Sequence, residues 1–307
     1  MTDRVDARLG ALYDDYRVVQ SLHDVPPHEV YEVRVGEQRA VYKGDTEPRG
    51  RAATEGAVTR VLADRTAVPV PAVRHVGADF YVADWHPAAP DPGAGLDGEP
   101  AWPERAGRGL ATLHAESRPL VEGYGRPSAD DGGLAAGHGD WHAAAVASLR
   151  ERRATLEAHG CADADAAVVT RVADLLADRP DAFEGAGPPV CCHGWWSPEH
   201  VAVREGGVAC VVDLEHALLA PAEWDYWRAA LPTFLAGEEA GLAAFREGYE
   251  SVRPLPAGVD DRAPWFRLLC GTYFMESLYV QDEHGPAATR ERAAALRERL
   301  SDRLEQR

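Results

Sequence analysis

The chain has 307 residues, of which 50 are acidic and 32 are basic, and its formal net charge is −18. Such an acidic balance argues against binding to nucleic acid, or to an anionic membrane, through a basic face. The length leaves room for one large domain or two modest domains with a substantial core.

Lys43 is the only lysine, and every other basic residue is an arginine. This acidic, lysine-poor composition resembles that of cytosolic proteins from halophiles that accumulate salt, in which a high net charge helps to keep proteins soluble. An ordinary acidic protein from a GC-rich genome is the alternative that the composition leaves open.

The five cysteines form no CxxC pair and no disulfide framework, so we expect buried thiols in a reducing compartment. Residues 1–18 are charged throughout and do not resemble a signal peptide. No segment approaches the ~18 uninterrupted apolar residues that indicate a membrane-spanning helix. We therefore expect a soluble, cytoplasmic protein.

The first part of the chain predicts alternating helices and strands. A helix is expected over residues 5–16, followed by an antiparallel hairpin whose second strand ends near Lys43. The next helix, over 50–63, carries Glu55 in its first half. The hairpin strands are expected at 31–35 and 40–43, and a further strand at 80–83.

A stretch rich in Pro, Gly, Ala and Asp, residues 87–103, predicts a loop and a candidate boundary. We expect a small α/β unit over 1–86 and a larger, mainly helical unit over 87–307. The chain thus predicts an α+β fold. In the second lobe, helices are expected at 104–116, 141–159, 163–178, 224–234, 239–249, 264–279 and 287–304, with a loose stretch at 123–139.

The segment 190–217 reads VCCHGWWSPEHVAVREGGVACVVDLEHA. It predicts an apolar strand, a turn with two tryptophans and a tight hairpin that ends on Asp213. An acid at the end of a buried strand is often placed for chemistry, so this segment is the first candidate for a site.

The order of these features resembles the aminoglycoside phosphotransferase/choline kinase family, a branch of the protein-kinase-like fold. The chain carries the family's VPVP segment at 68–71, its LxxLHA helix at 110–115, and the first two residues of its HGDxxxxN loop at 193–194. The VVDLEHA segment at 211–217 matches the strand that ends on the family's metal-binding Asp. The resemblance spans nearly the whole chain. It implies two lobes. Residues 1–86 would form a nucleotide-binding lobe with a small antiparallel sheet and one main helix, and residues 87–307 a larger, mainly helical lobe with the catalytic-type loop and the substrate region.

The resemblance also implies a phosphotransferase that uses ATP and Mg²⁺ to transfer a phosphoryl group to a hydroxyl. Lys43 would grip the nucleotide phosphates and Glu55 would be its ion-pair partner. Ala83 and Trp85 would lie in the hinge strand that contacts the nucleotide. Phosphoryl transfer depends mainly on positioning and charge neutralisation, which suits these roles.

The catalytic loop departs from the family pattern. Asp213 matches the metal-binding Asp, and Asp225 in EWDYW matches the aspartate that braces the loop. Trp195, however, stands where the family has its catalytic base, and His200 replaces the usual Asn. His200 could still bind a metal ion, although imidazole suits zinc and other transition metals better than Mg²⁺. The segment 22–28, which should cover the phosphates, contains no glycine.

Two acids near the altered loop could replace the lost base. Glu199 and Glu215 are the candidates, and ordinary solvated acids are the alternative reading of both. A second HGD, at 138–140, is not a second catalytic loop, because Ala145 stands where Asn would be needed. We interpret Asp140 as the N-cap of the helix that follows it.

Three hypotheses follow from the sequence. The first is a phosphotransferase of weak or atypical activity. Its substrate would carry a hydroxyl group, and a cationic substrate is one alternative that the acidic helical lobe leaves open. The second is a catalytically inactive, pseudokinase-type protein that binds a nucleotide or metabolite, with Trp195 and Trp196 filling the site or stacking on a ligand. The third, much less favoured, is a metal site outside kinase chemistry at Cys191, Cys192, His193 and His200. The sequence names neither the phosphate acceptor nor the oligomeric state.

Overall fold

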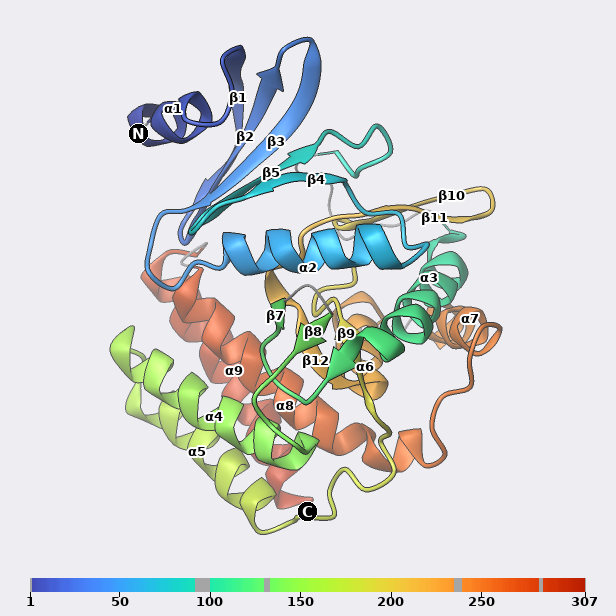
Figure 1. Cartoon of the computed structure of the whole chain (residues 1–307). Coiled ribbons are helices and arrows are strands. Elements are labelled where there is room, and N and C mark those ends of the chain that lie inside the picture. Colours follow the sequence, from blue (N-terminus) through green and yellow to red (C-terminus); the bar gives the residue numbers. More distant parts are fainter. Residues whose placement is uncertain (1, 92–99, 130–132, 235–238, 282–283, 307) are drawn as a thin grey trace.

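The computed structural model of the chain describes residues 2–91, 100–129, 133–234, 239–281 and 284–306. The loop expected at 87–103 therefore lies partly outside the described residues. Figure 1 shows a sheet at one end of the molecule, with the N-terminus beside it, and a larger body of helices below.

The sheet near the N-terminus has five antiparallel strands in the order β1-β2-β3-β5-β4. Helix α1 (Thr2–Gly10) packs against the sheet through Val5 and Leu9. Side chains that alternate along the strands, such as Val33 and Tyr42, fill the same small core. The strands are β1 (Tyr16–Val25), β2 (His28–Val35), β3 (Gln38–Asp45), β4 (Val73–Val76) and β5 (Phe80–Asp84).

The hairpin of β2 and β3 confirms the prediction from the sequence. Its turn begins at Gly36, whose φ of +57° glycine adopts without strain. The register pairs Val30 with Lys43, so the lysine lies near the end of β3, as expected.

The first helix is shorter than the sequence predicted. It ends at Gly10, and Tyr16 already pairs with Val35 as the first residue of β1. Tyr16 continues the apolar spacing of the helix in the sequence, but a single aromatic residue suits a strand equally well.

Helix α2 (Ala52–Arg65) lies between the sheet and the helical region (Figure 1). A Cβ atom added at Gly56 would lie 2.5 Å from the Cβ of Tyr81, so glycine lets the helix approach β5 closely. Val58 and Leu62 of the same helix belong to the large core of the helical region. Because α2 packs on both parts, it holds Glu55 at their junction.

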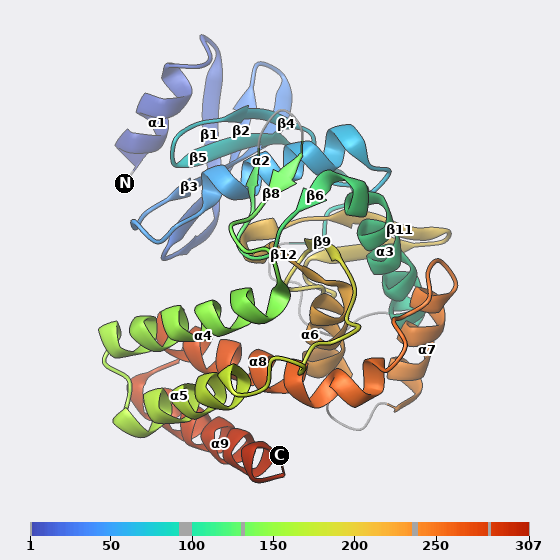
Figure 2. The same cartoon turned by 60° about the horizontal axis from the view of Figure 1, so that its bottom comes forward.

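The helical region contains two sets of packed helices (Figure 2). Helix α3 packs on α7, while α4 and α5 form a hairpin against α8 and α9. Buried side chains such as Leu113, Trp141 and Phe266 form one continuous core. The helices are α3 (Trp102–Ser117), α4 (Trp141–Ala158), α5 (Asp163–Ala177), α6 (Ala222–Phe234), α7 (Glu239–Glu250), α8 (Val259–Val280) and α9 (Pro286–Glu305).

Short strands organise the segment that carries the loop. β10 (Val201–Arg204) and β11 (Gly207–Val211) form the predicted hairpin. β9 (Pro189–Cys192) pairs with β12 (Leu218–Pro221), a pairing that the sequence did not predict. Because β12 pairs with β9, the residues that follow β11 lie next to the loop that follows β9.

The stretch at 123–139 is less irregular than predicted. It contributes β7 (Ser128–Ala129) and β8 (Leu134–Ala135), which form a small sheet with β6 (Val121–Glu122). Strands of two residues are too short to show a hydrophobic period in the sequence.

The predicted α+β class is confirmed, with an antiparallel sheet in the N-terminal region and a mainly helical C-terminal region. The lobe boundary near residue 86 stays a prediction. Among the described residues, no helix combines the length and the apolar character needed to cross a membrane.

Candidate active site

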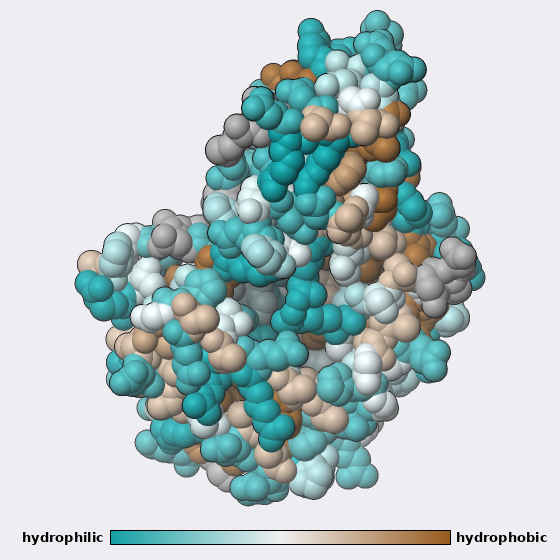
Figure 3. Space-filling model, turned by 60° about the vertical axis from the view of Figure 1, so that its left-hand side comes forward, coloured by the Kyte–Doolittle hydropathy of each residue, from teal (hydrophilic) through white to brown (hydrophobic). Residues whose placement is uncertain are grey.

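A buried lysine with three acidic partners lies where the sheet region meets the helical region. Lys43 is only 6 % exposed, and its Nζ lies 2.8 Å from Glu55 Oε2, 2.7 Å from Asp213 Oδ1 and 2.9 Å from Glu215 Oε2. Burial alone would lower the pKa of Lys43, but the neighbouring acids outweigh it and hold the pKa well above the usual value. The surface around this junction is hydrophilic and hollowed (Figure 3). Lys43 therefore stays protonated at neutral pH.

The backbone after β11 is shaped to present Asp213. Asp213 has a φ of +65°, in the left-handed region, where Asp and Asn occur more often than other non-glycine residues. Its Oδ1 faces Lys43, while its Oδ2 lies 3.1 Å from Nε2 of His200. The two metal-binding candidates from the sequence thus lie side by side.

His28 is a site residue that the sequence analysis missed. It is 5 % exposed, and its Nε2 lies 3.1 Å from Glu215 Oε2, while its Nδ1 lies 3.0 Å from Asp45 Oδ1. Burial lowers the pKa of His28, but the two carboxylates outweigh burial and raise it to about 9. The only signal in the sequence was its place at the turn between β1 and β2, in the segment without glycine.

Asp225 is hydrogen-bonded to the backbone at the start of the loop. Its carboxylate is fully buried and accepts hydrogen bonds from the backbone N–H of His193 (2.7 Å) and of Gly194 (2.9 Å). The ring Nε2 of His114 lies 3.3 Å from the same carboxylate. Burial would raise the pKa of Asp225, but its bonds to His114 and to the loop outweigh burial and lower the pKa.

We expect Asp225→Asn to destabilise the protein by about 2–4 kcal/mol, because an amide cannot accept all of these bonds and each charged hydrogen bond contributes roughly 1.5–3 kcal/mol. Urea unfolding of both proteins at pH 7 measures the difference. Asp181→Asn, at an exposed surface aspartate, is the matched control and should leave the stability unchanged.

The same pair of proteins should show a defined pH dependence. The folded pKa of Asp225 lies below its ordinary value of 3.8, so its stabilising contribution is present above that value and is lost as the pH falls through the folded pKa. The difference between the wild type and Asp225→Asn should therefore shrink in acid. A difference that is constant down to unfolding would contradict the bracing role.

The two tryptophans of the loop have different environments. Trp196 is 1 % exposed, and its indole N–H donates to the Ala106 carbonyl at 3.0 Å, so it is a core residue and does not fill the site. Trp195 is partly buried and packs edge-on against Phe274, with ring centroids 5.7 Å apart. Of the two, only Trp195 lies at the position expected for the catalytic base.

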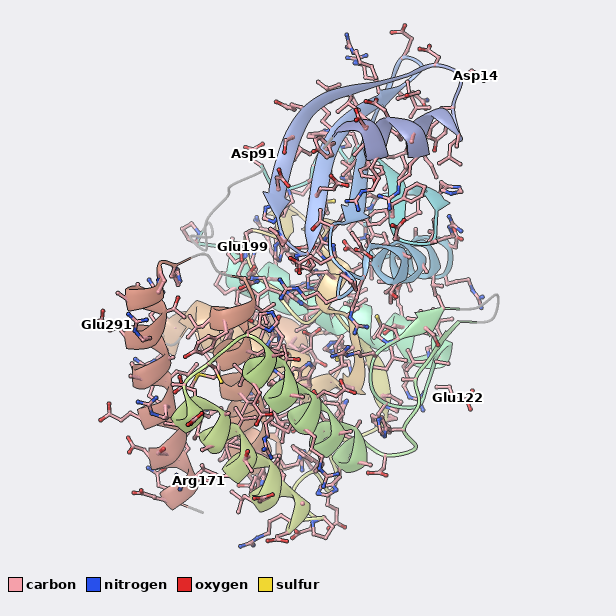
Figure 4. The ribbon with its side chains drawn as sticks, turned by 90° about the vertical axis from the view of Figure 1, so that its left-hand side faces the viewer. Asp14, Asp91, Glu122, Arg171, Glu199 and Glu291 are labelled. Atoms are coloured by element: carbon pink, nitrogen blue, oxygen red, sulfur yellow. The ribbon has the colours of Figure 1, made fainter. Side chains whose placement is uncertain are left out.

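Glu199 is engaged by its own loop. Its carboxylate accepts a hydrogen bond from the Trp195 indole N–H, and the Ser197 hydroxyl lies 3.3 Å away. Figure 4 places Glu199 at the level where the sheet region meets the helical region. Glu215, the other candidate substitute, is already paired with Lys43 and His28.

The hinge residues lie in and directly after β5. Ala83 is 3 % exposed and pairs with Val41 of β3. The backbone N–H of Trp85 donates to the backbone carbonyl of Arg39 at 3.2 Å, and the Arg39 guanidinium lies 3.7 Å from the centre of the Trp85 ring. One face of that indole is therefore already covered.

Two further interpretations from the sequence are confirmed. Asp140 is the N-cap of α4, since its Oδ1 accepts a hydrogen bond from the Ala143 N–H at 2.8 Å. All five cysteines are free thiols, and only Cys161 is not fully buried.

The cysteine-based metal hypothesis gains no support. Within the described residues, the groups of close ligand atoms are Glu55, Asp213 and Glu215 in the site and His114, Cys192 and Asp225 in the core. Cys191, Cys192, His193 and His200 form no such group there.

The metal ion that the resemblance implies is Mg²⁺, and the side chains match it poorly. The three acids around Lys43 supply the oxygen atoms that Mg²⁺ prefers, with ligand atoms within 4.8 Å of one another. Lys43 contacts all three acids, so its ammonium group already lies among them. The remaining oxygen of Asp213 faces an imidazole nitrogen of His200, which is a poor ligand for Mg²⁺.

Comparison with solved structures shows the same fold. A thermostable mutant of aminoglycoside phosphotransferase APH(4)-Ia, in a ternary complex with ADP and hygromycin B, has a TM-score of 0.67 at 15% identity over 98% of each chain. Macrolide 2'-phosphotransferase MphH from Brachybacterium faecium has a TM-score of 0.59 at 20% identity over 96% of each chain. A putative fructosamine-3-kinase from Thermobifida fusca has a TM-score of 0.64 at 20% identity, over 97% of this chain and 98% of that one.

Comparison with curated proteins found no match. The model of the phosphotransferase enzyme family, in contrast, matches residues 28–265, which include His28, Lys43, Glu55, the altered loop, Asp213 and Asp225. The match covers well over half of the chain, and we conclude that the chain belongs to the phosphotransferase enzyme family.

Proposed function

We propose that the protein binds a nucleoside triphosphate, ATP by resemblance to its family, and transfers a phosphoryl group slowly to a hydroxyl group of a small molecule. The observation that carries this proposal is the buried, charged Lys43, which meets Glu55 from α2 and Asp213 from a segment 170 residues away. A buried lysine is unfavourable without acidic partners, and we interpret a lysine that is held by three acids as a functional group. The neighbour that binds ADP and hygromycin B supports a nucleotide as the ligand.

Each site residue has a proposed role. Lys43, oriented by Glu55, would contact the phosphates, and Ala83 and Trp85 would lie beside the base. Asp225 would hold the catalytic loop through its bonds to the backbone N–H groups of residues 193 and 194. In this arrangement residues 1–86 would form the nucleotide-binding lobe.

The reaction would be slow because no carboxylate replaces the base. Trp195 cannot accept a proton, and Glu199 is bonded to its indole N–H. A general base typically contributes ~10²–10⁴-fold, and kinases turn over at roughly 1–100 per second. A site without a base would therefore keep roughly 10⁻⁴–1 per second.

A second candidate function is nucleotide or metabolite binding without transfer. Trp195 favours it, because an indole that packs against Phe274 stands at the loop position where the family has its catalytic base. When its ligand is a nucleotide, the second function shares nucleotide binding with the first and differs from it only in the absence of turnover.

Calorimetric titration with ATP tests the shared part of both functions. We expect saturable binding, measured at high KCl with either Mg²⁺ or Co²⁺ present. No binding under either condition would overturn the transferase and nucleotide binding without transfer. Phosphate release and a panel of hydroxylated acceptors then separate them: turnover that Asp213→Ala abolishes supports the transferase, and binding without turnover supports the second function. Turnover that survives Asp213→Ala would place the reaction elsewhere.

A further inference from the structure

A chain of buried hydrogen bonds connects α7 and α3 to the altered loop. The Tyr249 hydroxyl on α7 lies 2.9 Å from Nδ1 of His114 on α3, and Nε2 of the same ring lies 3.3 Å from Asp225 Oδ2. Asp225 in turn accepts hydrogen bonds from the backbone N–H groups of residues 193 and 194, at the start of the loop. All three side chains are fully buried, so solvent water does not replace any of these partners.

The close packing of two helices brings the tyrosine to the histidine. Helix α3 packs on α7 (Figure 2), and each helix presents a glycine to the other. A Cβ atom added at Gly107 or at Gly248 would collide with a backbone carbonyl of the facing helix. Tyr249 directly follows the second of these glycines, so the close approach places its hydroxyl within hydrogen-bond distance of His114.

The direction of each hydrogen bond follows from the protonation states. Burial lowers the pKa of His114, so its ring is neutral at pH 7 and carries one N–H. The ionised carboxylate of Asp225 can only accept, so that N–H belongs on Nε2 and a lone pair remains on Nδ1. Burial raises the pKa of Tyr249, so its hydroxyl keeps its proton and donates it to this lone pair. Tyr249 thus donates to His114, and His114 donates to Asp225.

The chain gives the carboxylate of Asp225 a fixed orientation. Its Oδ2 accepts from His114 and from the N–H of residue 193, while its Oδ1 accepts from the N–H of Gly194. With three donors on two oxygen atoms, a rotation of the carboxylate would break at least one of the bonds to the loop.

We propose that His114 and Tyr249 are positioning residues for the altered loop, which they hold through Asp225. Neither side chain needs to touch a ligand in this role, because Asp225 transmits their effect to the two N–H groups of the loop. Trp195 directly follows those groups, so the backbone at the position of the family's catalytic base depends on a tyrosine in α7. The inference rests on the proposed function for the part that the loop plays in phosphoryl transfer.

Amide hydrogen exchange, measured without any ligand, tests this proposal. Tyr249→Phe leaves Nδ1 of His114 without its donor, and an unpaired buried acceptor should speed the opening of the loop by about 5–100-fold. We therefore expect exchange at residues 193 and 194 to accelerate by this factor, and by more than exchange at the amides of β3, which report global unfolding. Tyr226→Phe is the matched control: it removes the hydroxyl of a ring that packs 5.6 Å from the Tyr249 ring, and it should leave exchange in the loop unchanged.

Two substitutions at His114 separate the hydrogen bonds from the packing. His114→Gln keeps both bonds, because its amide N–H donates to Asp225 and its amide oxygen accepts from Tyr249, whereas His114→Met keeps neither. We expect slow exchange in the loop of the glutamine variant and fast exchange in that of the methionine variant. Equal exchange in the two folded variants, or an acceleration in the loop no greater than that in β3, would overturn the proposal.

Turnover gives a second measurement. Tyr249→Phe should lower kcat by about 10–100-fold, because a small displacement of the loop disturbs the geometry of transfer. KM for ATP should stay unchanged, because Lys43 is oriented by Glu55, outside this chain of hydrogen bonds. An unchanged kcat together with faster exchange in the loop would overturn the positioning role. Exchange that follows the hydrogen bonds, in a protein that does not bind ATP, would overturn the proposed function alone.

Discussion

Replacement of Lys43 by methionine is expected to weaken ATP binding by about 10–10²-fold. The lysine supplies the buried positive charge at the centre of the site, and a hydrogen bond to a charged group contributes roughly 1.5–3 kcal/mol, or about one to two orders of magnitude in affinity. Its ammonium group is already oriented by Glu55 at 2.8 Å, so little ordering is required when phosphate oxygens replace Asp213 and Glu215 as its partners. Calorimetric titration with ATP measures the loss directly.

The same substitution should destabilise the fold, and the two effects must be separated. Without Lys43, the carboxylate of Glu55 is left 2 % exposed with no cation beside it, and breaking a buried pair in this way costs about 3–5 kcal/mol. The double variant Lys43→Met with Glu55→Gln removes both charges and should recover most of the stability. The Tyr81 hydroxyl, 2.9 Å from Glu55 Oε1, can still donate to the amide oxygen.

The comparison of the single and double variants is decisive. If Lys43 contacts phosphate, the double variant unfolds at nearly the wild-type urea concentration and still does not bind ATP. If binding returns together with stability, Lys43 is only a structural cation. Wild-type affinity in the single variant would also contradict its proposed role.

The framework of the site could be predicted because it depends on short-range patterns. Lys43 lies at the end of a strand with alternating apolar residues, and Glu55 lies in the first half of a helix. Asp213 follows a continuous apolar strand. Each pattern spans fewer than fifteen residues and carries its own hydrophobic period, which a sequence displays directly. The order of these patterns then identified the fold.

Contacts between distant segments could not be predicted in the same way. His28 meets Glu215, which is 187 positions later in the chain, and no local pattern announces that pairing. The neighbours Trp195 and Trp196 show the same limit at shorter range. The Trp196 indole donates to the Ala106 carbonyl on α3, while the Trp195 ring packs against Phe274 on α8. The packing of the helices decides both contacts. The sequence therefore does not show which of the two adjacent tryptophans lies in the core and which lies at the site.

Trp195→Asp is expected to raise phosphoryl transfer to water, or to an accepted hydroxyl compound, by about 10²–10⁴-fold, the usual contribution of a general base. The loop backbone is already held by Asp225, and Arg228 donates to the Gly194 carbonyl, so the introduced carboxylate would start from a fixed position. Loss of the contact between Trp195 and Phe274 should cost about 1–3 kcal/mol of stability. ATP hydrolysis measured with and without acceptors gives the rate.

Arg228 determines how large this gain can be. Its guanidinium is 1 % exposed and lies 5.3 Å from the Trp195 ring, and two of its nitrogens have no hydrogen-bond partner among the residues that the structure describes. A carboxylate introduced above it would be attracted to that charge, which lowers the pKa of the carboxylate and weakens it as a base. The gain should therefore fall near the lower end of the range and rise further in Trp195→Asp with Arg228→Met. Trp195→Asn distinguishes proton acceptance by the new carboxylate from the mere removal of the indole, because asparagine has nearly the same size as aspartate and accepts no proton. An equal gain in Trp195→Asn would mean that the indole acts by blocking the site, and no gain in either folded, ATP-binding variant would favour the binding function over transfer.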